Sequence, residues 1–311
     1  MREKIKTGMA LLIILLLLPY VAAVFRTGSM TGTEKQEEIT ELERCVAEVL
    51  PTEMPVTYEL EALKAQAVIV RTNLLCAAME YYGTESREEA AGQIRETDLE
   101  ILGFSYYTPI QEEKLWGYEN WERYREKCEK AAEATDSQVM IAGEKLLELP
   151  YHAVSAGKTR DGSVLGAAYQ WLESADCPED VEAPEYLHIR EWEPGELPAD
   201  TEILERDRAG YVTGVAADGI SLGGEEFRAR YGLESSCFSL ERTDEKVRIV
   251  TKGCGHGLGL SMYQANRFAN EGWKYSEILS YFYKNAVCIS FSESGYARDS
   301  KSNTAAEAVG V

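Results

Sequence analysis

The clearest helical pattern in the chain lies at residues 58–75. Apolar residues recur there at spacings of three and four and form one stripe: Leu60, Leu63, Ala67, Val70 and Leu74. This spacing predicts an amphipathic helix, and Thr57 is expected to cap it. Lys64 and Arg71 fall on one line beside the stripe, because seven residues make almost two helical turns. We therefore expect both cations to point the same way, at the margin of the buried face.

Glu53 lies just ahead of this helix, between two prolines at positions 51 and 55. Proline fixes its own backbone and restricts the residue before it, so the stretch predicts a rigid turn. A general acid needs such fixation and an apolar wall, which Met54 and the helix would supply. An ordinary solvated glutamate in a turn is the alternative. The preceding residues, 40–50, have helical spacing, although a strand is also compatible with them.

The remaining pattern mixes helices with short strands. Residues 84–134 are rich in charge with helical spacing, which predicts an inserted helical hairpin packed on the main domain. Short strands follow around a turn at Gly143, and residues 178–207, with four prolines, read as an irregular excursion or a sheet edge. A strand–turn–strand–helix unit then ends at Gly232. The predicted fold class is α+β, with one catalytic domain over residues 39–293.

Strands resume near Val247, and two helices close the domain. The first is expected to stop at Gly272, and Ser276 is expected to cap the second. After Glu293 the polar residues 294–311 predict a disordered tail.

The N-terminus has the pattern of a membrane anchor. Residues 1–8 are basic, and residues 9–25 contain no charge over 17 positions. This length is just sufficient to cross a bilayer, and the basic flank places the N-terminus inside and the catalytic domain outside the cell membrane. A cleavable signal peptide is the alternative, since small residues at 21–23 suit a cleavage site. Residues 26–38 are polar and predict a linker.

Composition narrows the partners. The 311 residues carry a net charge of −21, and no basic block offers a surface for nucleic acid. The seven cysteines show no paired spacing, so most are expected to be small buried apolar residues. An odd count outside the cell would leave at least one free thiol.

A second polar segment is the stretch "YHAVSAGKTRDG" at residues 151–162. Its polar side chains would suit a groove for a ligand rich in hydroxyl groups: His152, Ser155, Lys158 and Thr159. A surface turn is the alternative. The glycine spacing of a phosphate-binding loop is absent.

A third segment is "GCGHGLGLSMYQA" at residues 253–265, in which four glycines alternate around His256. Glycine there permits positive φ or a close approach of the backbone to a ligand. Cys254 and His256, two apart on a strand, would share a face, which leaves a hydrolase of peptide crosslinks as a minor alternative.

Together the motifs "EMP", "EALKAQAV", "HAVSAGKT" and "GHGLGLSMYQA" resemble, in order, the stage II sporulation protein D family, which includes amidase enhancers. The resemblance runs from about Ile39 to Cys288. It implies a metal-free lytic transglycosylase without a cofactor, with Glu53 as its catalytic acid. It also implies that Lys64 and Arg71 lie in the groove. With the polar residues of the other two segments, the expected substrate-binding residues are Lys64, Arg71, His152, Ser155, Lys158, Thr159, His256 and Ser261.

The resemblance also implies a biological setting. The substrate would be the glycan strands of peptidoglycan during engulfment of the forespore, and the partners would be the amidase stage II sporulation protein P and the membrane protein stage II sporulation protein M. A non-catalytic enhancer of a wall amidase is the rival function. The sequence departs from the family pattern at Ala156, Cys254, Met262 and Gln264. Some clostridial members bind zinc near the second motif, but His152 and Cys177 alone do not make a site.

Overall fold

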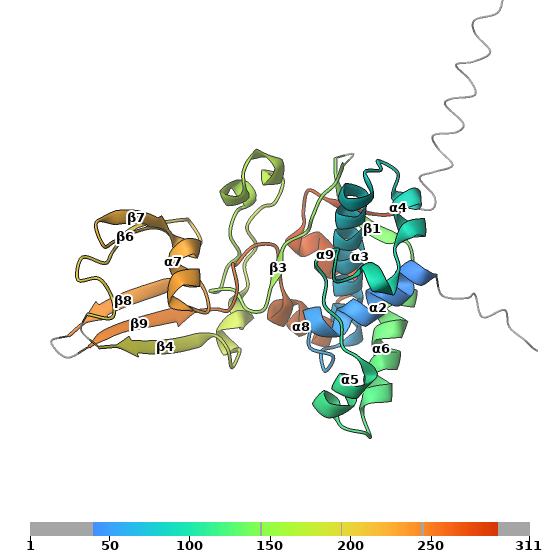
Figure 1. Ribbon diagram of the computed structural model, residues 1–311, viewed down its shortest axis with the longest axis horizontal. Helices are drawn as coiled ribbons and strands as arrows, with labels where there is room; N and C mark the ends of the chain where they lie inside the picture. The colour runs from blue at the N-terminus through green and yellow to red at the C-terminus, as the bar shows by residue number, and fades with distance from the viewer. Residues whose placement is uncertain (1–39, 144, 194, 244–245, 292–311) are drawn as a thin grey trace, which may run out of the picture. The chain divides into compact units, whose positions relative to one another are not determined.

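A computed structural model describes residues 40–143, 145–193, 195–243 and 246–291 (Figure 1). The predicted basic end, anchor, linker and tail (1–8, 9–25, 26–38 and 294–311) lie outside the described residues. Where the chain is described, its α-helices are α2 (Glu41–Glu53), α3 (Leu60–Tyr82), α4 (Arg87–Gln93), α5 (Pro109–Trp116), α6 (Trp121–Glu133), α7 (Gly224–Tyr231), α8 (Met262–Asn270) and α9 (Tyr275–Phe282). The strands are β1 (Gln138–Ala142), β2 (Lys145–Leu146), β3 (Tyr151–His152), β4 (Leu187–Trp192), β5 (Glu202–Arg206), β6 (Val212–Ala217), β7 (Ile220–Gly223), β8 (Phe238–Arg242), β9 (Val247–Lys252), β10 (Leu260–Ser261) and β11 (Val287–Ser290). The fold class is α+β, as predicted.

The segment around Glu53 is helical rather than a turn. Helix α2 contains Pro51 within its last turn and ends at Glu53. Proline cannot donate the helical hydrogen bond and crowds the preceding turn, so a helix stops soon after it. The Thr52 hydroxyl donates to the Val49 carbonyl at 2.8 Å, and Met54 is buried directly beyond the helix end. The predicted rigid turn is therefore wrong, but Glu53 is fixed at a helix terminus beside an apolar residue.

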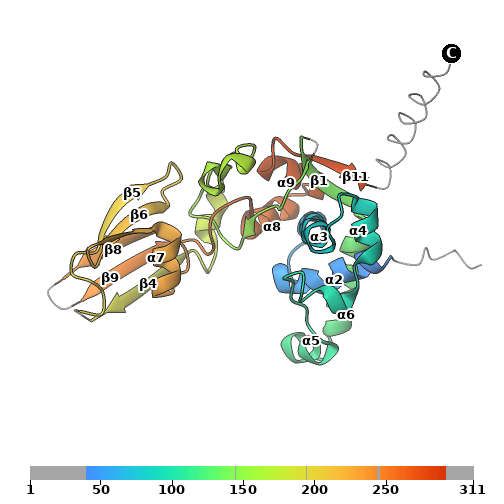
Figure 2. The same ribbon diagram turned by 45° about the horizontal axis from the view of Figure 1, so that its top comes forward.

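Helix α3 is the centre of the first hydrophobic core. Figure 2 shows it end on, with α2, α8, α9 and β1 around it, and it contacts each of them as well as α4 and α6. Because apolar neighbours cover it on all sides, it is buried rather than amphipathic. Of the described helices, only α3 has the length and composition to cross a membrane, and most of that apolar stretch is buried within the protein. Its N-cap is Glu59, not Thr57 as predicted.

The segment 84–134 contributes α4, α5 and α6. Helix α6 packs against both α2 and α3, and it buries Cys128, Ala131 and Ala132 in the first core. This segment is therefore helical, and its last helix covers the side of α3 that carries Arg71.

Two three-stranded antiparallel sheets, in the orders β4-β9-β8 and β5-β6-β7, surround a second core that includes Val212, Phe227 and Ile249. Strands β4 and β5 are edges of their sheets, as the prolines of residues 178–207 suggested. The turn at Gly143 and the helix end at Gly232 have positive φ and are confirmed.

The closing helices partly match the prediction. Gly272 lies just beyond Glu271, the C-cap of α8, and has positive φ. Helix α9, however, has Lys274 as its N-cap rather than Ser276, which lies inside the first turn.

Candidate active site

Strands β3 and β10 bring the second and third motifs together. They pair in parallel, with Tyr151 opposite Leu260 and His152 opposite Ser261. Parallel strands require a long connection, so this pairing joins residues about 110 positions apart in the chain. The two motifs form one site because of this ladder.

The glycine-rich stretch before β10 is shaped by contact with the protein's own chain. Its four alternating glycines all have positive φ: Gly253, Gly255, Gly257 and Gly259. A Cβ atom at Gly255 would lie 2.7 Å from the His152 Cβ, and one at Gly259 would lie 1.8 Å from the Pro150 carbonyl oxygen. The positive φ was predicted, but the close approach is to the backbone and side chains of the second motif. Since this stretch is not a regular strand, the inference that Cys254 and His256 share a strand face is wrong.

Glu53 reaches this ladder through Tyr151. The Tyr151 hydroxyl donates a hydrogen bond to Glu53 Oε2, and the Thr52 hydroxyl lies 3.4 Å from Oε1. Burial, together with the charge of Glu53, raises the pKa of Tyr151 well above its usual range. The phenol therefore stays protonated and acts as a permanent donor to the carboxylate. Glu53 itself is half-buried.

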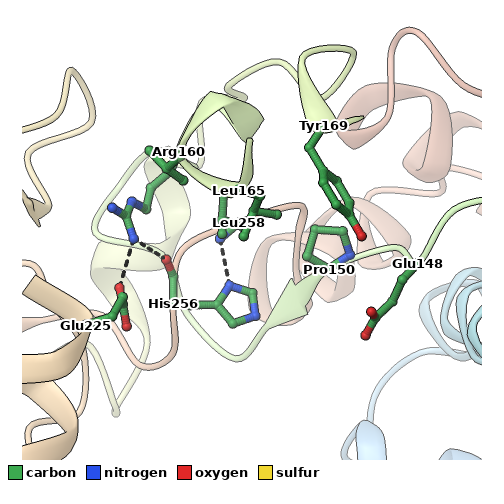
Figure 3. Close-up of a pocket in the computed structure, with 9 residues that line it drawn as sticks. Glu148, Pro150, Arg160, Leu165, Tyr169, Glu225, His256 and Leu258 are labelled. Atoms are coloured by element: carbon green, nitrogen blue, oxygen red, sulfur yellow. Dashed lines mark hydrogen bonds and ion pairs between the residues drawn. The ribbon is translucent and has the colours of Figure 1, made fainter. Parts of the chain in front are cut away.

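His256 lies beside the backbone of Tyr151. Its Nδ1 accepts a hydrogen bond of 3.0 Å from the Leu258 backbone N–H, so the proton of the neutral ring is on Nε2 (Figure 3). Burial lowers the pKa of His256, and a hydrogen bond with the Tyr151 backbone acts in the opposite direction. The neutral ring is thus held in one tautomer.

A cavity of about 380 Å³ opens beside His256 (Figure 3). Its wall mixes apolar side chains with carboxylates: Glu148, Pro150, Arg160, Val164, Leu165, Tyr169, Glu225, His256 and Leu258. Arg160 is almost fully buried and donates to Glu225 at 2.8 Å and to the His256 carbonyl at 3.3 Å. Glu53 does not line this cavity, but its partner Tyr151 follows the cavity residue Pro150 in the chain.

The chain is similar to known proteins. Residues 31–141 match the family model of SpoIID, described as stage II sporulation protein. The chain is similar to stage II sporulation protein D of Bacillus amyloliquefaciens, with 28% identity over 278 residues that cover 86% of this chain and 78% of the relative. The protein of the same name from Bacillus subtilis (strain 168) is 27% identical over the same shares. Residues 31–141 of this chain therefore belong to the SpoIID family.

The SpoIID family model spans α2, α3 and the helices up to β1, and so includes Glu53. A third relative, the amidase enhancer of Bacillus subtilis, is 24% identical over 283 residues, which cover 78% of this chain and 40% of that protein. The second and third motifs lie beyond the family model but within the long alignments to the SpoIID proteins.

Arg71 is not where its helical position predicted. It is fully buried and forms an ion pair with Glu43, and it donates to the carbonyls of Gln138 at 3.0 Å and Ala132 at 3.1 Å. The expectation that Arg71 lies in a substrate groove is therefore wrong, because α6 and β1 cover its side of α3. Lys64 remains partly accessible, but it pairs with Glu61 at 2.8 Å.

Four further predicted binding residues are also inside the protein: His152, Ser155, Thr159 and Ser261. The ring Nδ1 of His152 donates to the Leu258 carbonyl at 3.0 Å, and burial lowers its pKa to about 3. The Thr159 hydroxyl accepts from the Ala175 N–H at 2.8 Å. These side chains shape the site from within and do not face a ligand. His256 and Lys158, by contrast, each line a cavity.

Asp180 organises the buried part of the site and was not predicted. Its carboxylate accepts from the Ser155 N–H at 2.7 Å and from the Ser261 hydroxyl at 2.8 and 2.9 Å. Burial raises its pKa to about 6, against the opposing hydrogen bonds. It thus connects the second motif to the third. No sequence signal marks it, because acidic residues soon after a proline, as in the segment 178–180, are common.

The described part of the chain holds no cluster of three His, Cys, Asp or Glu side chains placed to bind a metal ion. Cys177 is buried, with its thiol 3.8 Å from the Ala175 carbonyl oxygen.

Proposed function

We propose that this protein is a membrane-anchored lytic transglycosylase that cleaves the glycan strands of peptidoglycan during sporulation. The observation that carries the proposal is Glu53, a half-buried carboxyl group fixed at the end of α2 and held by the Tyr151 hydroxyl. The relatives named stage II sporulation protein D support the sporulation setting.

The reaction needs one carboxyl group rather than the pair of a hydrolase. Protonated Glu53 gives its proton to the bridging oxygen between N-acetylmuramic acid and N-acetylglucosamine, and the bond from that oxygen to the muramyl C1 breaks. The 6-hydroxyl of the same muramyl sugar attacks C1 and loses its proton to the Glu53 carboxylate. A 1,6-anhydro ring closes, the acid is regenerated, and no water, metal or cofactor takes part.

The hydrogen bond from Tyr151 gives the two carboxyl oxygens of Glu53 different roles. Because the Tyr151 hydroxyl donates to Oε2, while the Thr52 hydroxyl lies farther from Oε1, at 3.4 Å, we assign Oε1 to the bridging oxygen and later to the 6-hydroxyl. A single oxygen that first gives and then takes a proton suits a mechanism in which both events occur on one face of the sugar.

The neighbouring cavity has the size and character for a sugar unit. Its volume of about 380 Å³ lies in the range of ligand sites. Tyr169, Leu165 and Pro150 offer apolar surface to a ring face, while Glu148 and Glu225 accept hydrogen bonds from hydroxyl and amide groups. A glycan strand bound in this cavity would pass Tyr151, and its next glycosidic bond would approach Glu53.

The proposed setting includes the membrane and two partners. Residues 9–25 would anchor the protein with its catalytic domain facing the wall, beside an amidase of the stage II sporulation protein P type and the membrane protein stage II sporulation protein M. Recovery of a soluble mature chain that begins near Val24 would contradict the anchor.

Mass spectrometry of the products is the deciding experiment. The purified domain is incubated with denuded glycan strands and with intact sacculi, and 1,6-anhydromuramyl ends are counted. We expect such ends to accumulate with denuded strands. Folded protein that binds strands, yields no anhydro ends and accelerates a partner amidase would instead support the enhancer function, which the resemblance to the amidase enhancer favours.

A further inference from the structure

The proposed substrate carries a negative charge that needs a partner. Once stem peptides are removed, each muramyl sugar bears a lactyl carboxylate, and this group distinguishes peptidoglycan from uncharged chitin. The two cations that the helical pattern placed in the groove do not serve it, because Arg71 is buried in an ion pair and Lys64 is held by Glu61. The partner of the lactyl carboxylate is therefore sought among the cations beside the first cavity.

A second cavity, of about 550 Å³, borders the first, since Val164 lines both. Three cations face into it: Lys158, Arg206 and Arg208. They come from segments far apart in the sequence, the loop of the second motif and the end of β5 with the following turn. In a protein with a net charge of −21, three cations around one cavity form a local positive region.

The two carboxylates of this cavity are already occupied. Asp207 accepts from the Arg160 guanidinium at 2.6 Å and from the N–H groups of Ala209 and Tyr211, both at 3.0 Å. Asp161 accepts from the Ser163 N–H at 2.9 Å. Neither carboxylate therefore uses the cations of the cavity as its main partner.

The cations are correspondingly open to a ligand. Arg206 donates to the neutral carbonyls of Gly210 at 2.9 Å and Phe238 at 2.7 Å, which orient its guanidinium without cancelling its charge. Arg208 is exposed and attracts the Asp161 carboxylate of the same cavity electrostatically, without a hydrogen bond or ion pair to any residue that the structure describes. Lys158 has only an exposed pair with Asp176 at 3.3 Å, a contact that contributes little.

We propose that the second cavity binds the lactyl carboxylate of a muramyl sugar while the neighbouring sugar occupies the first cavity. This inference rests on the proposed function, because it assigns the substrate preference of the same site. Arginine and lysine provide charge-assisted hydrogen bonds to a carboxylate, and the oriented guanidinium of Arg206 adds geometric selection. The cavity then selects strands that an amidase has already stripped of peptides.

The test measures binding apart from cleavage. The Glu53→Gln protein is titrated by calorimetry with soluble denuded glycan and with the same glycan after chemical reduction of its carboxyl groups to alcohols. We expect the reduced glycan to bind about tenfold more weakly or worse, since charge-assisted hydrogen bonds are lost. Adding Lys158→Gln and Arg208→Gln should weaken binding of the intact glycan and abolish the difference between the two ligands.

Arg230→Gln is the matched control. Arg230 is an exposed arginine on α7 with a distant partner, Glu226 at 3.8 Å, so its loss changes net charge without touching the cavity. Equal affinity for intact and reduced glycan, or an equal loss in the Arg230→Gln protein, would overturn the proposal, as would binding of neither ligand.

A further titration tests which carboxylate the second cavity binds, that of the lactyl group or that of a stem peptide. Glycan that keeps its first stem-peptide residue has no lactyl carboxylate but carries a peptide carboxylate. Binding as tight as that of denuded glycan would assign the cavity to a peptide carboxylate and overturn the lactyl assignment. A wild-type protein that shows the preference but forms no anhydro ends would contradict the proposed catalysis and leave this binding site supported.

Discussion

The hydroxyl of Tyr151 donates a hydrogen bond to the carboxylate of Glu53, across 98 positions of the sequence. Tyr151 belongs to β3, whose partner β10 follows the glycine-rich motif, and Glu53 ends α2. This one contact therefore joins the first motif to the second and third. It also supplies a way to test whether the carboxylate acts in catalysis or only in packing.

Tyr151→Phe removes the donor and keeps the ring. Because Glu53 would lose the contact that fixes its carboxylate, we expect kcat for glycan cleavage to fall by about 10²-fold, the cost of misplacing a reacting group, with KM nearly unchanged. The measurement is steady-state release of anhydro ends from denuded strands.

Tyr283→Phe is the control for that change. Tyr283 is also buried, and its hydroxyl donates to the Pro150 carbonyl at 2.7 Å, next to Tyr151 in the chain. Its loss should lower the melting temperature without a comparable fall in kcat. If both variants lose stability and activity in the same proportion, Tyr151 has only a structural role.

Glu53→Gln keeps the size of the side chain but removes its titratable proton. General acid–base groups contribute about 10²–10⁴ in rate, so anhydro products should drop toward the detection limit while glycan binding persists. Glu59→Gln, at an exposed position just before α3, should retain activity. A folded Glu53→Gln protein that cleaves at the wild-type rate would remove Glu53 from the mechanism.

Arg71→Ala tests the correction of the sequence-based assignment. Removal of one partner from a buried ion pair leaves Glu43 and two carbonyl groups without this donor, so we expect a loss of about 3–5 kcal/mol in the free energy of unfolding. Arg44→Ala, which breaks an exposed pair with Glu41 on α2, should cost less than about 1 kcal/mol. Urea unfolding followed by tryptophan fluorescence gives both values. An Arg71→Ala protein of wild-type stability that fails only in glycan binding would restore Arg71 to the groove.

Local patterns predicted the elements better than their surroundings. The helix α3 itself, the turn at Gly143 and the helix end at Gly232 depend on residues close in sequence, and all three are present. Arg71 was misplaced because the spacing within one helix does not reveal that α6 and β1 cover its second side. A helical pattern predicts the direction in which a side chain points, but it does not predict which other elements pack against that side chain.

The prediction of the site residues was limited in the same way, because their contacts are with residues far apart in the sequence. The stretch from residue 151 to 162 pointed to His152, whereas its neighbours Tyr151 and Arg160 make the contacts that reach Glu53 and the cavity. Asp180 gave no signal, because its importance comes from two serines, one 25 and the other 81 positions away. Long-range pairing of β3 with β10 creates these relationships, and no periodicity encodes it.

The buried carboxylate of Asp180 makes stability depend on pH in a direction opposite to that of most aspartates. Its pKa is about 6 in the folded protein, because burial raises it from 3.8. Between these values the folded protein keeps a proton that the unfolded chain has released, so this group contributes stability below pH 4 that is lost as pH rises to about 6. The shift corresponds to a contribution on the order of 2–3 kcal/mol.

Asp180→Asn removes this dependence. Asparagine can still accept from Ser261, but its amide group would face the Ser155 N–H, so the variant is expected to be less stable than wild type at low pH. The informative quantity is the difference in unfolding free energy between wild type and variant, measured in urea from pH 4 to pH 7. The unfolding free energy of wild type minus that of the variant should decrease as pH rises to about 6 and then remain constant. Asp161→Asn gives the opposite sign, because hydrogen bonds with Ser163 lower the pKa of Asp161, so its contribution is lost as pH falls. A wild-type minus Asp180→Asn difference that rises with pH would show that Asp180 is ionised in the folded protein and that its hydrogen bonds with Ser155 and Ser261 outweigh its burial.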